Sequence, residues 1–222
     1  MNESLDQRIK ISNNQIPLII VDNFYVPSIL EKKEIEKIIF TEKEKFDKFR
    51  DSKKDYNFAL TQDYNSFLGN LYKNFFSLCE KLFGDLKVSS NNNNTVWSFC
   101  SNEDYFLDFW HDHITTCTIS GVYYFSMPDL KNGFIEFLQD DKTFKFYPEE
   151  NQLIIFPNFL SHKPNKIKTK DYRIAMNMEI LSNFSSTQLF SKVFSKKRIT
   201  KKTRTSIING TEFVDTVEYP IN

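Results

Sequence analysis

Apolar side chains recur every three or four residues along the stretch 65–83, which is the spacing of one face of an α-helix. The positions are Leu68, Leu71, Tyr72, Phe75, Phe76, Cys79, Leu82 and Phe83. Gly84 follows directly, and glycine often ends a helix in a left-handed conformation. The pattern predicts a helix over 65–83 whose aromatic face packs into a protein core.

The N-terminal part predicts a strand followed by another helix. Residues 16–26 are rich in branched and aromatic side chains, as β-strands are. Ser28 and Glu31 form a capping box, and apolar residues continue beyond them at helical spacing. We expect a helix from Ser28 to the low forties. The charged stretch 43–63 is interpreted as an irregular or partly helical connection.

After a turn-rich segment at 89–94 the pattern changes to short apolar runs. The runs lie at 95–100, 115–126, 133–138, 144–147, 152–157 and 172–181. Short strands at roughly ten-residue spacing, with no helical period between them, are typical of an antiparallel sandwich or barrel. We therefore expect an α+β chain that is mainly β, with an N-terminal strand and helices at 1–94 packed on a β core at 95–182.

Beyond residue 182 the pattern weakens and the chain becomes basic. Seven lysines and arginines fall between Lys192 and Arg204. Residues 206–214 carry Asn209-Gly210 at their centre, a pair typical of two-residue hairpins. The extension at 183–222 is interpreted as a basic segment with a hairpin. It is either a solvated face or a contact for a phosphate-bearing or acidic partner.

Charge and cysteine content narrow the classes of function. Lysine and arginine together number 29, as do aspartate and glutamate, so no net field would draw the chain to nucleic acid or an anionic membrane. Cys79, Cys100 and Cys117 lack metal-ligand spacing and are interpreted as reduced, buried thiols. With a polar N-terminus and no apolar run of membrane-span length, a soluble cytoplasmic protein is expected.

All three histidines of the chain fall within the predicted β core. His111 and His113 are two residues apart, so in an extended segment both side chains project to one face while Asp112 points away. His162 follows the apolar run 153–156, and a sandwich or barrel would bring it beside the first pair. Three imidazoles together would suit iron, zinc, copper or nickel. The alternative is chance, with two surface histidines and one hydrogen-bonded core residue.

Arg173 adds a candidate anion site. It lies eleven residues after His162, in the apolar sequence Tyr-Arg-Ile-Ala-Met-Asn. A guanidinium that is buried without a partner is costly, so an arginine inside a barrel needs an anion. A dicarboxylate cosubstrate would supply that anion through a bidentate pair.

A series of short motifs follows in order along the predicted β core. They are Trp97, Trp110-His111-Asp112-His113, Ser120-Gly121-Val122-Tyr123-Tyr124, Pro148, Leu153-Ile154-Ile155-Phe156-Pro157, His162 and Arg173-Ile174-Ala175-Met176-Asn177. Their order and spacing resemble the iron(II)- and 2-oxoglutarate-dependent oxygenases. Within that family the sequence is most similar to the prolyl-hydroxylase-like groups and to a phage and bacterial set with His-x-His before Ser-Gly-Val-Tyr-Tyr. The likeness covers about residues 95–181.

The resemblance implies a double-stranded β-helix (jelly roll) core that uses Fe(II) and the cosubstrate 2-oxoglutarate. His111 and His162 would ligate iron, with His113 where the family usually has an aspartate. Arg173 and Tyr124 would bind the distal carboxylate of 2-oxoglutarate. The implied reaction hydroxylates an aliphatic C–H bond of a peptidyl substrate, prolyl included, or of a small molecule, and releases succinate and CO2. Ascorbate would be an accessory reductant.

Non-haem iron oxygenases generally bind iron through two histidines and one carboxylate. His113 stands at the position of the carboxylate, so this sequence departs from that ligand set. Three hypotheses follow: a working site with three histidine ligands, a site in which a nearby carboxylate replaces His113, and a metal site that does not perform oxygenation. The candidate carboxylates are Asp112, Asp108 and Glu136. Strand alternation puts Asp112 on the wrong face unless the strand breaks there.

Two classes of function therefore compete. The first is a 2-oxoglutarate-dependent dioxygenase, which the spacing of Arg173 from His162 favours. The second is a metal-binding cupin-like protein without oxygenase activity, either a zinc or nickel enzyme or a binding module, which the missing aspartate favours. A structural jelly roll with incidental histidines is a third, more remote alternative.

Overall fold

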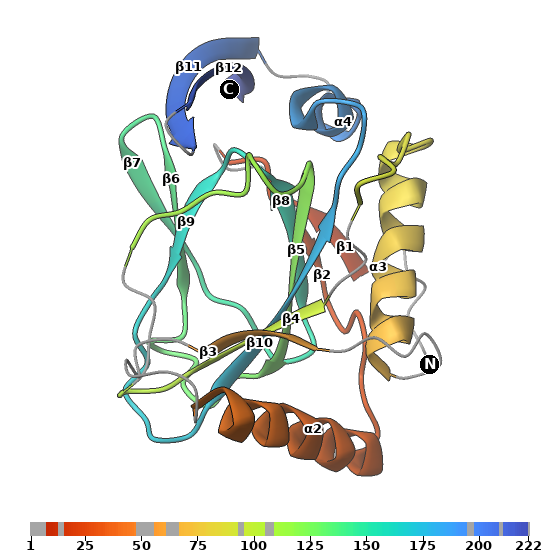
Figure 1. Ribbon diagram of the computed structural model, residues 1–222, viewed down its shortest axis with the longest axis vertical. Helices are drawn as coiled ribbons and strands as arrows, with labels where there is room; N and C mark the ends of the chain where they lie inside the picture. Colours follow the sequence, from red (N-terminus) through yellow and green to blue (C-terminus); the bar gives the residue numbers. More distant parts are fainter. Residues whose placement is uncertain are drawn as a thin grey trace.

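A computed structural model gives the fold of the chain (Figure 1). It describes residues 8–12, 16–47, 56–60, 67–92, 96–104, 109–194, 198–208 and 211–221. The strands within these ranges form three antiparallel sheets, of seven, three and two strands. Helices pack on the outside of the largest sheet (Figure 1).

The seven-stranded sheet forms one wall of the molecule. In spatial order its strands are β1 (Ile9–Ile11), β2 (Ile19–Val21), β8 (Leu153–Pro157), β5 (Ile119–Ser126), β10 (Arg173–Ile180), β4 (Val96–Ser101) and β3 (Tyr56–Leu60). β10 pairs with β5 along one edge and with β4 along the other. The segment before residue 95 contributes β1, β2 and β3, so it shares this sheet with the predicted β core.

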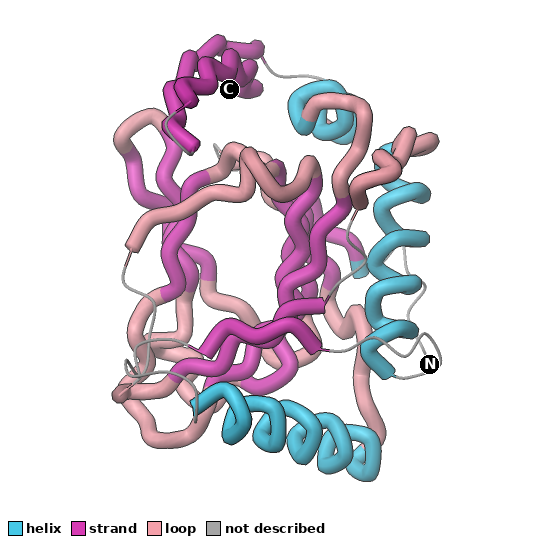
Figure 2. The backbone as a smooth tube through the Cα atoms, viewed as in Figure 1, coloured by secondary structure: helices cyan, strands magenta, loops and turns pink. Residues whose placement is uncertain are grey.

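The second sheet faces the first across an apolar interior (Figure 2). Its order is β7 (Lys142–Phe146), β6 (Ile135–Gln139) and β9 (Ser161–Pro164). Residues of both sheets fill the interior, among them Val122, Tyr124, Ile135, Phe137, Ile154, Phe156 and Ala175. Two facing antiparallel sheets around one core are the arrangement of a jelly roll, and the predicted fold class is confirmed.

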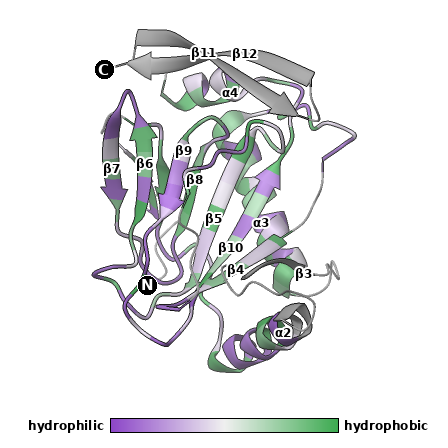
Figure 3. Ribbon diagram, turned by 60° about the vertical axis from the view of Figure 1, so that its left-hand side comes forward, coloured by the Kyte–Doolittle hydropathy of each residue, from purple (hydrophilic) through white to green (hydrophobic). Residues whose placement is uncertain are grey.

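The opposite face of the large sheet is covered by helices α2 (Ile29–Asp47), α3 (Phe67–Phe83) and α4 (Ser186–Val193). Side chains alternate across a strand, so Ile174, Met176 and Met178 of β10 pack under these helices while Ala175 faces the interior. Hydrophobic and hydrophilic residues are interspersed along α2 (Figure 3), and Ile35 and Ile39, one turn apart, belong to the core. Because the sheet is buried on both faces, β8 is apolar throughout.

The helix predictions are confirmed with changed limits. The predicted helix at 65–83 is α3, and Gly84 ends it with a φ of 76°. The Ser28 hydroxyl accepts the N–H of Glu31 at 3.3 Å, and the Glu31 carboxylate accepts the N–H of Ser28 at 2.8 Å, which is the predicted capping box. In the stretch 43–63, interpreted as an irregular or partly helical connection, the helical part is the end of α2 at Asp47. The strand β3 in the same stretch was not predicted.

Each of the six predicted apolar runs overlaps one strand, namely β4, β5, β6, β7, β8 or β10. The strand predicted at 16–26 is shorter, since only Ile19–Val21 is paired with β8. Four described elements were not predicted, namely β1, β3, β9 and α4. The short helix α4 begins with its own capping box, formed by Ser185 and Gln188.

The basic C-terminal extension forms an antiparallel pair of long strands, β11 (Arg198–Ile208) and β12 (Thr211–Ile221). The two strands flank the predicted Asn209-Gly210 turn, which itself lies outside the described residues. All three cysteines are buried and free, as expected. None of the described helices has the length and apolar character that crossing a bilayer requires.

Candidate functional site

The fold brings the three histidines together at one end of the jelly roll interior. His111 and His162 lie opposite each other, and their backbones exchange two hydrogen bonds of 3.1 and 2.9 Å. His113, two residues along, places its Nε2 atom 3.3 Å from Nε2 of His162. One ligand atom from each histidine lies within 4.8 Å of the others, so this triad could hold one metal ion.

The outward nitrogen of each imidazole contacts an oxygen. The oxygens on Nδ1 are the Phe109 carbonyl for His111 at 3.5 Å, the Leu160 carbonyl for His162 at 3.0 Å and a Glu179 carboxylate oxygen for His113 at 2.8 Å. Carbonyl and carboxylate oxygens accept hydrogen bonds, so a proton on each Nδ1 leaves the lone pair of each Nε2 available to a metal. The Nε2 atoms of His113 and His162 lie 3.3 Å apart. A cation between them would accept one lone pair from each ring.

The donor set fits a first-row transition metal. Two nitrogens that each lie about 2.1 Å from one ion, at an angle near 100°, are separated by about 3.3 Å, which is the observed spacing of the Nε2 atoms. Imidazole nitrogen is a common ligand of iron, zinc, copper and nickel. The geometry alone does not select among these metals.

The electrostatics of the triad favour the neutral form that binds metals. Burial, followed by repulsion from His111 and His113, holds the pKa of His162 well below its usual value. Burial and the neighbouring His113 also lower the pKa of His111. His111 and His162 are therefore neutral around pH 7, and no proton has to leave either ring before a metal binds.

Two of the three carboxylates considered from the sequence lie elsewhere. Asp112 accepts the backbone N–H of the residue two positions on, at 3.3 Å. Glu136 faces Lys145 and Lys163, each 3.9 Å away. Asp108 lies outside the described residues. Within the described part of the chain, the histidine triad is the one group of His, Cys, Asp and Glu with metal-ligating spacing.

Arg173 is buried in the same interior, at 2 % exposure. Its Nε donates to the Ser101 hydroxyl at 3.0 Å and its Nη1 donates to the Asn165 carbonyl at 2.9 Å, while Nη2 has no partner. Burial lowers the pKa of Arg173 to about 10, so the guanidinium stays cationic at neutral pH. A buried cation with both other nitrogens occupied and Nη2 unpaired is suited to bind an anion.

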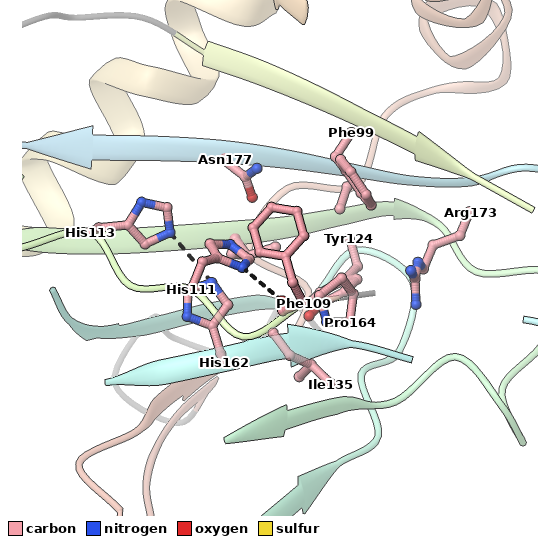
Figure 4. Close-up of a pocket in the computed structure, with 12 residues that line it drawn as sticks. Phe99, Phe109, His111, His113, Tyr124, Ile135, His162, Pro164, Arg173 and Asn177 are labelled. Atoms are coloured by element: carbon pink, nitrogen blue, oxygen red, sulfur yellow. Dashed lines mark hydrogen bonds between the residues drawn. The ribbon is translucent and has the colours of Figure 1, made fainter. Parts of the chain in front are cut away.

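One pocket of about 200 Å³ joins the triad to Arg173 (Figure 4). Its lining is Phe99, Phe109, His111, His113, Val122, Tyr124, Ile135, His162, Pro164, Arg173, Ala175 and Asn177. The histidines lie at one end and Arg173 at the other, with Phe99, Tyr124 and Pro164 between them (Figure 4). Burial raises the pKa of the Tyr124 hydroxyl, so it stays protonated beside the guanidinium.

Part of this site was not predicted from the sequence. Phe99 and Asn177 line the pocket, and Glu179 contacts His113 from outside it. A usable signal existed in the predicted strand 172–181, because alternation puts Arg173, Asn177 and Glu179 on one face. Phe109 offered no such signal, because it lies in a loop without a periodic pattern.

Comparisons with known proteins identify the fold of the chain but not its family. No family model matches the sequence, and no curated protein matches it either. Solved structures do resemble it. A prolyl-4-hydroxylase from Pseudomonas putida has a TM-score of 0.55 at 11% identity, over 75% of this chain and 93% of that one.

Two further solved structures have the same fold. HygX from Streptomyces hygroscopicus, solved with nickel and 2-oxoglutarate bound, has a TM-score of 0.52 at 10% identity, over 78% of this chain and 85% of that one. EvdMO1 has a TM-score of 0.57 at 11% identity, over 77% of this chain and 48% of that one. At such low identity these likenesses establish the jelly roll fold, and function rests on the site.

Proposed function

We propose that the chain is an Fe(II)- and 2-oxoglutarate-dependent dioxygenase of the prolyl-hydroxylase-like type. One observation carries the proposal: the unpaired Nη2 of buried Arg173 lies in the same pocket as three histidines with converging nitrogens. A metal site alone would not require a buried cation. A cosubstrate with a carboxylate at one end and a metal-chelating group at the other uses both features.

The side chains of the pocket would bind either the metal or the cosubstrate. His111, His113 and His162 would hold iron, and Arg173 and Tyr124 would bind the distal carboxylate of 2-oxoglutarate. Iron, when bound, would supply the redox chemistry by which dioxygen is consumed. One oxygen atom would enter succinate as 2-oxoglutarate loses CO2, and the other would be inserted into an aliphatic C–H bond. Apolar residues on the pocket wall would limit the access of water.

The substrate would be a peptidyl side chain, prolyl included, or a small molecule, and it would reach the triad past Phe109. We infer a cytoplasmic location, which the three unpaired and buried cysteines support. The balanced charge of the chain supports a substrate other than nucleic acid or membrane.

The competing function is metal binding without oxygenase activity, as in a cupin-like protein. His113 favours it, because three neutral imidazoles leave the site without the negative charge of the usual carboxylate ligand. This alternative predicts a metal site that is indifferent to 2-oxoglutarate and to changes at Arg173.

Anaerobic titration of the apoprotein with Fe(II) and then 2-oxoglutarate separates the two functions. Chelation of iron by the 2-oxo acid produces a weak visible charge-transfer band, which we expect in the wild type and not in His162→Ala. Arg173→Gln should weaken 2-oxoglutarate binding about 30-fold or more, because removing one partner of a buried charge pair costs 2 kcal/mol or above.

Lys142→Gln is the matched control, since it removes the same charge from an exposed position outside the pocket. It should leave both the band and the affinity unchanged. Iron binding without any band in the wild type, or a band that Arg173→Gln does not weaken, would refute the dioxygenase and favour the cupin-like alternative.

A further inference from the structure

We propose that Glu179 is a positioning residue for the metal centre: its carboxylate orients His113 and places a negative charge beside the three-histidine site. The inference rests on the proposed function, because it concerns how the same triad holds its metal. It answers the question raised by His113, namely where a site without a carboxylate ligand obtains its negative charge.

The contact between the two side chains is short and sheltered. A Glu179 carboxylate oxygen lies 2.8 Å from Nδ1 of His113, and the two side chains are only 19 % and 21 % exposed. Thr116 donates its hydroxyl to the same carboxylate at 3.3 Å. The opposite nitrogen of His113, Nε2, faces His162. Glu179 therefore fixes which nitrogen of His113 points to the metal.

The strand that carries Glu179 holds its position firmly. Glu179 is the seventh residue of β10, and its Cα is registered with that of Ser120 in β5. Its carbonyl oxygen accepts the hydroxyl of Tyr72 from α3 at 3.0 Å. A carboxylate on an interior strand with its backbone tied on both sides is well suited to orient a neighbouring ring.

The three histidines differ in the charge of their outer partners. His111 and His162 contact backbone carbonyls, which are neutral, and only His113 contacts a carboxylate. The Glu179 carboxylate thus contacts His113, the histidine that stands where the resembled family usually has an aspartate ligand. Glu136 cannot supply the same charge, because two lysines face its carboxylate.

A cobalt(II) titration of the apoprotein tests this assignment without relying on catalysis. Glu179→Ala should weaken Co(II) binding about 10–100-fold, the usual effect of losing such an outer partner, and should change the visible d–d spectrum as His113 loses its orientation. Glu179→Gln keeps an acceptor oxygen but removes the charge. It should lie between the wild type and Glu179→Ala in affinity.

Glu136→Gln is the matched control, because its carboxylate is also largely buried, at 17 % exposure, but contacts no histidine in the described structure. It should bind Co(II) as the wild type does. In a His113→Ala background, Glu179→Gln should have no further effect, since the side chain through which it acts is gone.

The inference is overturned if both Glu179 variants bind Co(II) within twofold of the wild type, or if Glu136→Gln weakens binding as much as they do. Thermal unfolding of the apoproteins identifies any variant that does not fold, and Glu179→Gln, which is nearly isosteric, then carries the test. Failure of the proposed function looks different: the wild type would show no 2-oxoglutarate band, or His162→Ala would bind the metal unchanged.

Discussion

His162 and Arg173 are both ionisable and buried, but they meet the cost of burial in different ways. His162, at 4 % exposure, is held neutral by its surroundings, whereas Arg173 keeps its charge and lacks one partner. A neutral imidazole is ready for a metal ion, and an incompletely paired guanidinium is ready for an anion. The two residues thus define the two ends of the pocket.

The burial of His162 predicts how the stability of the apoprotein depends on pH. The pKa of His162 is lowered in the folded state, so as the pH falls below about 6.5 the unfolded chain takes up a proton that the folded protein does not bind. The free energy of unfolding should therefore decrease on acidification, by up to about 1.4 kcal/mol per pH unit from this residue.

Urea unfolding of the metal-free protein at about pH 7.5, 6.5 and 5.5 measures this loss. His162→Gln removes the titrating group, so its stability should fall less steeply over the same interval. Parallel slopes for the wild type and the variant would mean that His162 is not held neutral by the fold.

At the residue scale, the histidines, Tyr124 and Arg173 could be named as candidate site residues from the sequence, because they belong to motifs whose residue types and spacing indicate a chemical role. It did not predict the contact between Glu179 and His113, since the two are 66 positions apart in the chain. Their meeting depends on how β10 is placed against the loop after His113, and that placement is a tertiary property.

β5 connects the site to the helical layer through alternate residues. Val122 and Tyr124 line the pocket, while Tyr123 and Phe125 belong to the core under the helices. On the face that carries these aromatic residues, β5 lies close to α3. Gly121 permits this approach, because a Cβ built on it would lie 2.5 Å from the buried ring of Phe75.

Gly121→Ala should therefore destabilise the protein by about 1–3 kcal/mol, as overpacking of a close-packed core generally does. The free energy of unfolding from urea titration measures the loss. Phe75→Leu, which shortens the opposing side chain, should reduce the cost of Gly121→Ala by about 1 kcal/mol in a double-mutant cycle. Strictly additive effects of the two substitutions would contradict the proposed clash.

At the scale of elements, periodicity identified α3 and the apolar strands because their burial follows the period of the local structure. β9 was missed although it carries His162: its sequence, Ser-His-Lys-Pro, has neither alternation nor β-propensity. It is a strand because β6 pairs with it. β3 was missed for a similar reason, as its pairing with β4 lies within a charged stretch.

At the scale of the molecule, the triad joins parts of the chain that are distant in sequence. A metal that binds His111, His113 and His162 binds only the folded state, so it should stabilise the whole domain. At a hundred times its dissociation constant, Ni(II) should add about 2.7 kcal/mol, which corresponds to a rise of about 5–10 °C in the unfolding temperature.

Thermal unfolding with and without Ni(II) checks this expectation, with His162→Ala as the control that should show little rise. An equal rise in the wild type and the variant would locate the metal outside the triad.

The order of strands in the large sheet also dictates when the site can form. Before β10 is made, the chain has two separate sets of partners: β1, β2, β8 and β5 form one, and β3 and β4 form the other. β10 joins them, and it carries both Arg173 and Glu179. A growing polypeptide therefore cannot close the sheet or complete the pocket until residues 173–180 have been synthesised, so the pocket forms late in the production of the chain.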